Sequence, residues 1–393
     1  MALPLTAAFD LPLAFLVVLA ALAALAGRRE RTRPRSLVVL VVLGFVGARL
    51  ASALAAPHAP VGMQSLAPLL PSLLLFFVLS EWIDTRRHIT AVCASLTAAG
   101  FVLATALLTA SWLSASADAD AWASAVPSPM LVVKNDVTVV AVLAPLALAL
   151  ASLGIHRFVR VAVLAFFGAL VAVVAVVHSR TALLTTVVAV VAFGALTGGW
   201  RPSGRARARW IFLGAGALML ALAVDAVVGF RFVHKLLHDW QGSGRLALWM
   251  AAAAMFRDAP LLGHGPGSFG PQYRAYLYTL QLPSWIDVDP RLTPWAHNLY
   301  LELLAEGGVI GLAAFLALAA AGVSMINRVR TRRPDDLQRL GAAAGAGFIA
   351  LLTAAFLEVS FLRAWVTILL FALLGLLTAV TRSAMECTPC KRP

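Results

Sequence analysis

Charged residues are scarce in this chain: only 12% of its 393 residues are Asp, Glu, Lys or Arg, whereas 61% are hydrophobic. This balance excludes an ordinary soluble domain and predicts a polytopic membrane protein. The formal net charge of +13 could suggest a nucleic-acid partner. Most basic residues, however, lie in short loops between apolar runs. We therefore expect membrane lipids as surroundings and no nucleic acid as partner.

Cysteine is nearly absent, since the chain has only Cys93, Cys387 and Cys390. Three cysteines cannot form a disulfide framework. Cys387 and Cys390 make a CxxC pair near the end of the chain, but a structural zinc site needs a second pair of ligands. A plain tail is favoured over a zinc site.

Long apolar runs, in contrast, fill the sequence. A transmembrane helix needs about 20 mainly apolar residues. Runs of this kind predict about eleven membrane-spanning helices. They lie near residues 11–26, 37–56, 66–83, 89–113, 130–153, 161–178, 181–198, 210–230, 299–326, 340–359 and 365–381.

Lys and Arg are missing from alternate loops. Residues 57–65 and 114–129 contain neither, whereas the loops on the other side of the spans are rich in Arg. Basic loops remain in the cytoplasm of membrane proteins. The pattern therefore predicts that the N-terminus, the polar stretch 231–298 and the turn at residues 358–363 face outward.

The polar stretch divides the chain into three predicted parts. Residues 1–230 hold N-terminal transmembrane helices, residues 231–298 form an outer loop that carries an active site, and residues 299–393 hold the remaining helices and a cytoplasmic tail. The charged and histidine residues of the stretch are Arg231, His234, Lys235, Arg245, Arg257, His264, Arg274, Asp287, Asp289 and His297.

Two short helices are expected inside this stretch. Residues 244–258 are rich in Ala and Met, and residues 272–282 carry three tyrosines, which predicts two interfacial helices. A run of glycines and prolines from Pro260 to Gly270 predicts an irregular loop between them. At the membrane, such backbone must be buried in protein or face water.

Two arginines at predicted helix starts are candidate phosphate ligands. Arg180 follows Ser179 where the sixth and seventh spans meet almost without a loop, and Arg245 follows three small residues. A guanidinium pairs with two phosphate oxygens and stays charged. A snorkelling arginine at position 180 and an ordinary exposed arginine at position 245 are the alternatives.

His297 and Asn298 stand where the chain re-enters the membrane. An imidazole titrates near neutral pH and can act as a general base, although a histidine at a helix start is often structural. Glu302 and Glu306 follow at helical spacing and share one face. Carboxylates at this depth need partners, and Arg180 or Arg245 are the expected ones.

Other charged groups near the membrane also invite a role. Lys134, Asn135 and Asp136 begin the fifth span at its outer end, and Arg49 lies within the second. Each could belong to an intramembrane ion pair. Glu358 and Arg363 flank the last outer turn and are most simply a structural pair.

Several motifs are too incomplete to carry chemistry. Gly263, Gly265 and Gly267 resemble a nucleotide loop, but no strand precedes them. The acidic pairs at residues 118 and 120 and at residues 287 and 289 lack the further oxygens that a hard cation needs. No nucleophile elbow is visible. We expect neither a metal nor a cofactor.

Four segments together resemble the O-antigen ligase family, which includes O-antigen polymerases and bacterial protein O-oligosaccharyltransferases. They are KNDVTVVAVLAPLAL from Lys134, HSRTALL around Arg180, GRLALWMAAAAMFRDAPLLGHGPGSF from Gly244, and AHNLYLELLAEGGVIGL from Ala296. Each is modest alone. Their order and their placement on one predicted membrane face make the combination specific.

The resemblance implies an all-α glycosyltransferase of the GT-C type with about twelve spans, acting without metal and with inversion. Such enzymes transfer a glycan from undecaprenyl diphosphate to an acceptor, in the ligases the lipid A–core oligosaccharide, on the periplasmic face of the bacterial inner membrane. The positions that match the functional residues of the family are His297, Arg180 and Arg245. Substrate-binding candidates around them are Asn298, Lys134, Asn135, Ser179 and Glu302.

The outer loop lacks the large added domain of many protein-glycosylating members, which favours a ligase or a polymerase. A transporter or flippase for a lipid-linked glycan is the rival from another class, and it should show inverted repeats and broken helices. The sequence shows no repeat. It leaves open the glycan, the acceptor sugar and the oligomeric state, a monomer included.

Overall fold

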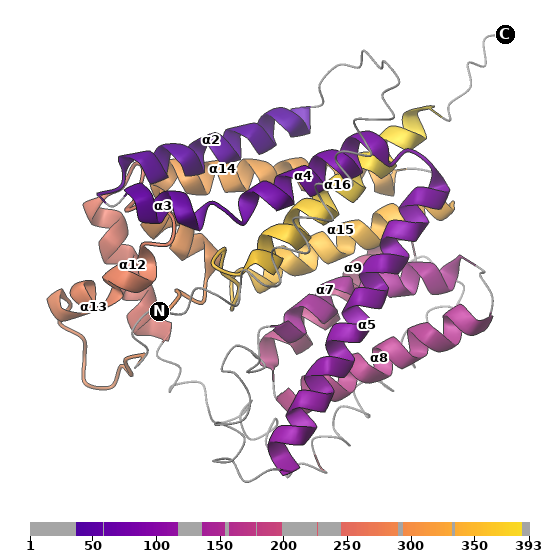
Figure 1. Ribbon diagram of the computed structural model, residues 1–393, viewed down its shortest axis with the longest axis horizontal. Coiled ribbons are helices and arrows are strands. Elements are labelled where there is room, and N and C mark those ends of the chain that lie inside the picture. The colour runs from indigo at the N-terminus through magenta and orange to yellow at the C-terminus, as the bar shows by residue number, and fades with distance from the viewer. Residues whose placement is uncertain are drawn as a thin grey trace. The chain divides into compact units, whose positions relative to one another are not determined.

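The computed structural model shows helices joined by turns and loops, with no strand among the residues that it describes (Figure 1). The described residues are 37–57, 59–116, 136–153, 157–177, 179–198, 226, 245–289, 294–331 and 335–386. Their helices are α2 (Leu37–Ala55), α3 (Ala59–Ser65), α4 (Leu69–Trp82), α5 (Arg86–Ser116), α7 (Val137–Ser152), α8 (Arg157–Val177), α9 (Arg180–Leu196), α12 (Arg245–Asp258), α13 (Phe269–Thr279), α14 (Leu299–Arg330), α15 (Asp336–Ala354) and α16 (Ala364–Glu386).

Seven helical segments within the described residues are long and apolar enough to cross a membrane. They are Leu37–Ala55, Gly62–Trp82, Arg86–Thr109, Arg157–Val177, Leu299–Arg330, Asp336–Ala354 and Ala364–Ser383. Two shorter apolar helices, α7 and α9, coincide with further predicted spans. The chain is thus an all-α polytopic membrane protein, as its composition predicts.

Some sequence predictions fall on residues outside the described part. These are the predicted span 11–26, the predicted span 210–230 apart from residue 226, the acidic pair at 118 and 120, and the two cysteines of the tail. The tenth span, predicted for residues 340–359, ends earlier than expected, because α15 stops at Ala354 and a turn follows. The prediction of which loops face the cytoplasm stays a prediction, as does the division of the chain at residues 230 and 298.

The chain forms two compact units, each assembled from separate stretches of sequence. Unit 1 comprises residues 1–82, 240–325 and 355–378, and unit 2 comprises residues 83–239, 326–354 and 379–393. The long helices α14 and α16 contribute residues to both units.

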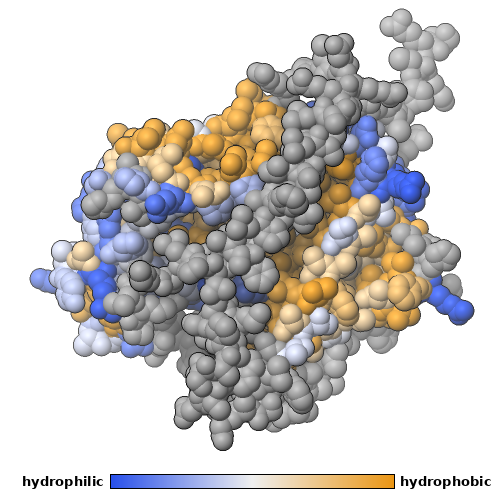
Figure 2. Space-filling model, viewed as in Figure 1, coloured by the Kyte–Doolittle hydropathy of each residue, from blue (hydrophilic) through white to orange (hydrophobic). Residues whose placement is uncertain are grey.

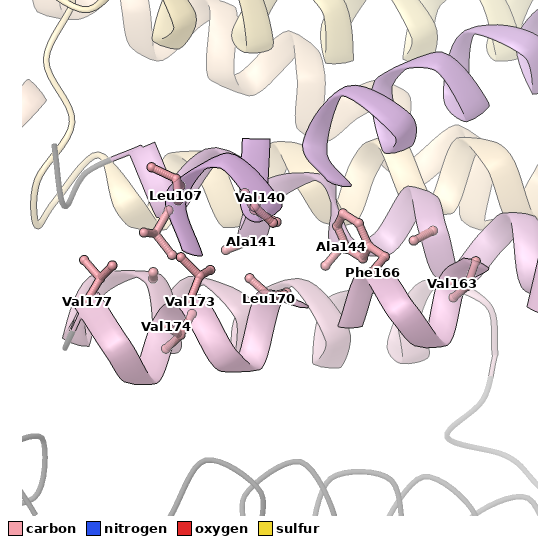
Figure 3. Packing of buried hydrophobic residues seen from close by; sticks show 14 residues of the cluster. Leu107, Val140, Ala141, Ala144, Val163, Phe166, Leu170, Val173, Val174 and Val177 are labelled. Atoms are coloured by element: carbon pink, nitrogen blue, oxygen red, sulfur yellow. The ribbon is translucent and has the colours of Figure 1, made fainter. Parts of the chain in front are cut away.

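Apolar side chains hold α5, α7 and α8 together in unit 2. Figure 3 shows Phe166, Leu170 and Val173 on the face of α8 that meets α7, where Val140 and Ala144 lie opposite. Small residues of α7 let the larger side chains of α8 fit between them. This is the close packing by which helices associate in a membrane, where water supplies no driving force between them.

Gly341 and Gly345 of α15, at GxxxG spacing, allow close helix packing. A Cβ atom on Gly341 would lie 2.8 Å from the side chain of Val380, and one on Gly345 would lie 2.9 Å from Ile326. The same spacing at Gly307 and Gly311 of α14 serves no such contact, since a Cβ atom on Gly307 would meet nothing within 4 Å.

Arginines of the predicted cytoplasmic loops form ion pairs and hydrogen bonds with the ends of helices in unit 2. Arg86 pairs with Asp336, the guanidinium of Arg339 donates to the carbonyl of Ser152 at 2.9 Å, and that of Arg382 donates to the carbonyl of Ile83 at 3.1 Å. The last carbonyls of a helix lack partners within the helix, so these bonds complete them.

Unit 1 has two different kinds of surface. Leucines of α2 are exposed, with Leu37 at 73% and Leu54 at 63%. Figure 2 shows hydrophobic residues over α2 and more hydrophilic residues over α12 and α13. The two helices predicted for the polar stretch are present as α12 and α13, the second beginning three residues earlier than expected.

Candidate functional site

His297 lies directly before α14 and has an unusual backbone conformation. Its φ of 51° is the one positive φ among the described residues other than glycine. This left-handed conformation costs an L-residue about 1–2 kcal/mol. Strain of this kind persists where the surrounding structure enforces it, and it is concentrated at functional sites.

The imidazole of His297 lies against an aromatic ring. Its centre is 4.7 Å from that of Trp295, with 36° between the ring planes, and the histidine is half-buried. Trp295 thus limits the positions that the imidazole can take. A half-buried imidazole of fixed orientation is suited to accept a proton from a bound hydroxyl group.

Asn298 caps the start of α14. Its side-chain oxygen accepts hydrogen bonds from the backbone N–H groups of Tyr300 at 3.0 Å and Leu301 at 3.1 Å. These are two of the N–H groups that a helix leaves without an internal partner, and Asn is a preferred residue for this task. Its predicted contact with substrate stays a prediction. As the cap, Asn298 fixes the point at which α14 begins, next to His297.

Arg245 is the first residue of α12, as predicted, and it is half-buried. One turn further, Trp249 donates its indole N–H to the carbonyl of Ala296 at 3.1 Å. Ala296 directly precedes His297. Residues four apart lie on one face of a helix, so Arg245 shares a face of α12 with Trp249. The bond from Trp249 to Ala296 therefore places this face beside the segment that carries His297.

Glu302 and Glu306 are buried in unit 1, at 1% and 2% exposure. The predicted partners, Arg180 and Arg245, are not the ones observed. Glu306 pairs with Arg49 of α2, with 3.6 Å between Oε2 and Nη2, and Glu302 accepts a 2.6 Å hydrogen bond from the hydroxyl of Ser360. A buried carboxylate needs a positively charged partner that is buried as well. Arg49, itself 3% exposed, is that partner.

A kink at Gly308 separates the first turns of α14 from the rest of the helix. Gly308 has φ 60° and ψ −162°, which is not helical. The break leaves backbone groups that a loop completes: the N–H groups of His264 and Gly265 donate to the carbonyls of Ala305 and Glu306 at 3.1 and 2.8 Å. The N–H of Val309 donates in return to the carbonyl of Pro260 at 2.8 Å.

Two glycines allow this close pairing of loop and kink. A Cβ atom on Gly263 would overlap the backbone of Glu306, and one on Gly308 would overlap the backbone of Leu261. Both have a positive φ, which glycine adopts without strain. The glycines that superficially suggest a nucleotide loop therefore serve the contact between loop 259–268 and α14.

A polar group ties the same loop to α12 and α13. The hydroxyl of Tyr276 donates to a carboxylate oxygen of Asp258 at 2.7 Å, and Nε2 of His264 lies 3.0 Å from the carbonyl of Met255. Partial burial and the hydrogen bond to Asp258 raise the pKa of Tyr276 to about 12. Tyr276 therefore stays a neutral donor at physiological pH and joins α13 to the end of α12.

The turn between α15 and α16 also contacts the start of α14. The N–H of Leu299 donates to the carbonyl of Ala355 at 2.8 Å. The guanidinium of Arg363 lies over the ring of Trp295, 5.1 Å from its centre. The predicted pair of Arg363 with Glu358 is wrong, since no ion pair joins these two within the described residues; the aromatic face is the contact that Arg363 makes.

Ser179 and Arg180 lie in unit 2. The hydroxyl oxygen of Ser179 accepts from the N–H of Ala182 at 3.2 Å and caps α9, whose first residue is Arg180. Arg245 and His297 belong to unit 1, and the prediction that Arg180 joins them stays a prediction. Lys134 and Asn135 lie outside the described residues.

Sequence reasoning missed Trp295 and Ser360 near the start of α14. The prediction that Arg49 belongs to an intramembrane ion pair is confirmed, although Glu306 was not named as its partner. The signal for Arg49 was that a charged residue inside an apolar span requires a partner. Trp295 lies two residues from the candidate base, and an aromatic ring so placed was a second available signal.

The described residues contain no group of three His, Cys, Asp or Glu side chains close enough to hold a metal ion. The pair Asp287 and Asp289 gains no third ligand there. The positive groups at the described ends of helices, such as Arg245, are the candidates for binding an anionic substrate.

Residues 164–316 match the family described as O-antigen ligase. The matched segment runs from α8 into α14 and includes Arg180, Arg245 and His297, whereas Lys134 and Asn135 precede it. No curated protein matches the chain. The family supports an enzyme of the O-antigen ligase or polymerase type that uses lipid-linked glycans. Through these residues, this multi-pass membrane protein is similar to the O-antigen ligase family.

Proposed function

We propose that the protein is an O-antigen ligase of the GT-C type. It transfers a glycan from undecaprenyl diphosphate to the lipid A–core oligosaccharide on the periplasmic face of the bacterial inner membrane. The observation that carries this proposal is the strained, half-buried His297 beside the helix face that bears Arg245, both inside the segment that matches the family.

Arg245 has the role of neutralising the diphosphate. The sugar–phosphate bond breaks easily once the charge that develops on the phosphate is stabilised, and a guanidinium can provide this stabilisation at a site of low dielectric. The start of α12 adds the positive end of a helix dipole. Arg180, at the start of α9, is proposed as the second arginine because of the resemblance and the family match.

His297 has the role of general base. The acceptor hydroxyl oxygen attacks the anomeric carbon from the side opposite the diphosphate, and its proton moves to the imidazole. The bond between the anomeric carbon and the phosphate oxygen breaks, and undecaprenyl diphosphate leaves with the bonding electrons. One displacement inverts the anomeric centre. The protein accelerates this step mainly by holding two lipids in register.

The remaining predicted site residues contribute unequally in this proposal. Asn298 and Ser179 cap helices and set the positions of their neighbours His297 and Arg180. Glu302 is buried against Ser360 and supports the site from inside rather than touching substrate. Lys134 and Asn135 stay candidate substrate ligands.

An O-antigen polymerase is the alternative within the family, and a protein O-oligosaccharyltransferase is another. A transporter is less favoured, although the kink in α14 is a broken helix of the kind that transporters use. In this protein the free backbone groups of the kink bind a loop of the chain itself, and the family match indicates an enzyme.

The test is a transfer assay with the purified protein in lipid nanodiscs. Glycan on undecaprenyl diphosphate is supplied with and without lipid A–core, in the presence of EDTA. The proposal expects glycan attached to lipid A–core, and no product when the acceptor is omitted. Lengthened donor without acceptor would identify a polymerase, unchanged glycan would favour a transporter, and loss of activity restored by Mg²⁺ would overturn the metal-independent mechanism.

A further inference from the structure

Three side chains form one stack at the start of α14. The guanidinium of Arg363 lies 5.1 Å from the centre of the Trp295 ring, and the imidazole of His297 lies 4.7 Å from the same centre. A cation and a second ring both contact one indole. The position of the indole therefore depends on Arg363, and the position of the imidazole depends on the indole.

The turn that carries Arg363 is itself fixed to α14. The hydroxyl of Ser360 donates to Oε1 of Glu302 at 2.6 Å, and the N–H of Leu362 donates back to that hydroxyl oxygen at 3.1 Å. The N–H of Arg363 donates to the carbonyl of Ser360 at 3.1 Å. The bond between Ser360 and Glu302 is short and buried, so it holds the turn against α14.

The turn and α14 thus hold the stack between them. Arg363 reaches Trp295 from the turn, while His297 and Trp295 belong to the segment that leads into α14. A second bond closes this arrangement, since the N–H of Leu299 donates to the carbonyl of Ala355 at 2.8 Å. A displacement of Arg363 would therefore be transmitted to the imidazole through a single aromatic ring.

We propose that Arg363 is a positioning residue for the glycosyl transfer: through the ring of Trp295 it holds the imidazole of His297 toward the acceptor hydroxyl, and the bond between Ser360 and Glu302 fixes the turn from which it acts. This inference rests on the proposed function. It gives Arg363 the role of positioning the base, His297, and not the role of binding the diphosphate. A guanidinium is able to contact an aromatic ring or a phosphate.

The kinetic test compares Arg363→Gln and Arg363→Lys with the wild-type protein. Misplacement of a catalytic group by about 1 Å costs on the order of 10²-fold in rate. We expect Arg363→Gln to lower kcat by about that factor with the donor KM within about twofold, because donor contacts remain. Arg363→Lys keeps a cation over the ring and should recover most of the rate. Arg257→Gln, at an exposed arginine in the last turn of α12, is the matched control.

The second readout does not require turnover. In protein labelled at the Cε1 atoms of histidine, the His297 signal is assigned by its loss in His297→Asn. Stacking on Trp295 should displace its proton resonance through the ring current of the indole. This displacement should shrink in Arg363→Gln and persist in Arg363→Lys and Arg257→Gln.

Three results would overturn the inference. An increased donor KM with unchanged kcat would make Arg363 a phosphate ligand. An unchanged His297 resonance in Arg363→Gln would show that the stack does not position the imidazole. A wild-type protein without transfer activity, but with the expected change in resonance, would confirm the stack while removing both the proposed function and the role of Arg363 in it.

Discussion

Two clusters of buried residues are held together by different forces. In unit 2, α8 packs on α5 and α7 through apolar side chains such as Phe166 and Leu170 (Figure 3). In unit 1, the first turns of α14 are held by an ion pair, side-chain hydrogen bonds and a paired loop. Polar groups are costly to bury and tolerate few alternative arrangements. The second cluster therefore specifies one geometry, next to the residues proposed to act on substrate.

The largest effect should come from breaking the ion pair of unit 1. Arg49→Ala leaves the carboxylate of Glu306 buried without its partner, which should lower the free energy of unfolding by about 3–5 kcal/mol. Thermal unfolding of the purified protein in detergent measures this loss. Arg160→Ala, at an exposed position of α8, is the matched control and should cost little.

A double variant sharpens the same comparison. Arg49→Met combined with Glu306→Gln removes both charges, and it should recover most of the stability that Arg49→Ala loses. If Arg49→Ala lost no more stability than the control Arg160→Ala, the view that this ion pair holds the first turns of α14 would be contradicted.

The ion pair also shows that helices could be predicted from the sequence, whereas contacts between distant helices could not. Nine of the eleven predicted spans coincide with described helices, because about 20 apolar residues in a row indicate a span directly. The partner of Glu306 was predicted wrongly, since that contact joins segments far apart in the chain, as does the hydrogen bond from Ser52 to Glu306 across 254 positions. Hydropathy carries no information on such pairings.

The site was predictable to the extent that local sequence determines it. Arg245 at a helix start and His297 before a span follow from small residues and apolar runs on either side. The break at Gly308 was missed, because the loop that meets it at Leu261 directly follows α12 and lies far from Gly308 in the sequence. Only the folded chain shows that this loop completes the broken helix.

Removing a large apolar side chain from unit 2 should be the next largest effect. Leu170→Ala should destabilise the protein by about 2–5 kcal/mol through a cavity between α8 and its neighbours. The turnover of the fraction that remains folded should stay unchanged, since no polar contact is lost. Reduced turnover with intact stability would show that the apolar cluster also shapes the site.

Arg245→Ala tests the polar region directly. We expect a loss of roughly 2–5 kcal/mol in donor stabilisation, the scale for removing one partner of a buried charge pair. Donor binding and kcat/KM in nanodiscs measure this loss, with Arg257→Ala as the control on the same helix. Equal kinetics for the two variants would remove Arg245 from the proposed mechanism.

The smallest effects concern two adjacent glycines. Gly308→Ala places a side chain at φ 60° and against the backbone of Leu261, which should cost about 1–3 kcal/mol of stability. Gly307→Ala meets nothing within 4 Å and should be neutral or stabilise by up to about 1 kcal/mol. Thermal unfolding of both variants compares them, and equal transitions would contradict the kink as described.

The turnover of His297→Asn tests the central claim most directly. Asn tolerates the left-handed backbone of position 297 but cannot accept the proton of the acceptor. The proposed mechanism predicts that kcat for transfer to lipid A–core falls by about 10²–10⁴-fold while the protein unfolds as the wild type does. Full turnover of this variant in the purified system would contradict the claim that His297 is the base.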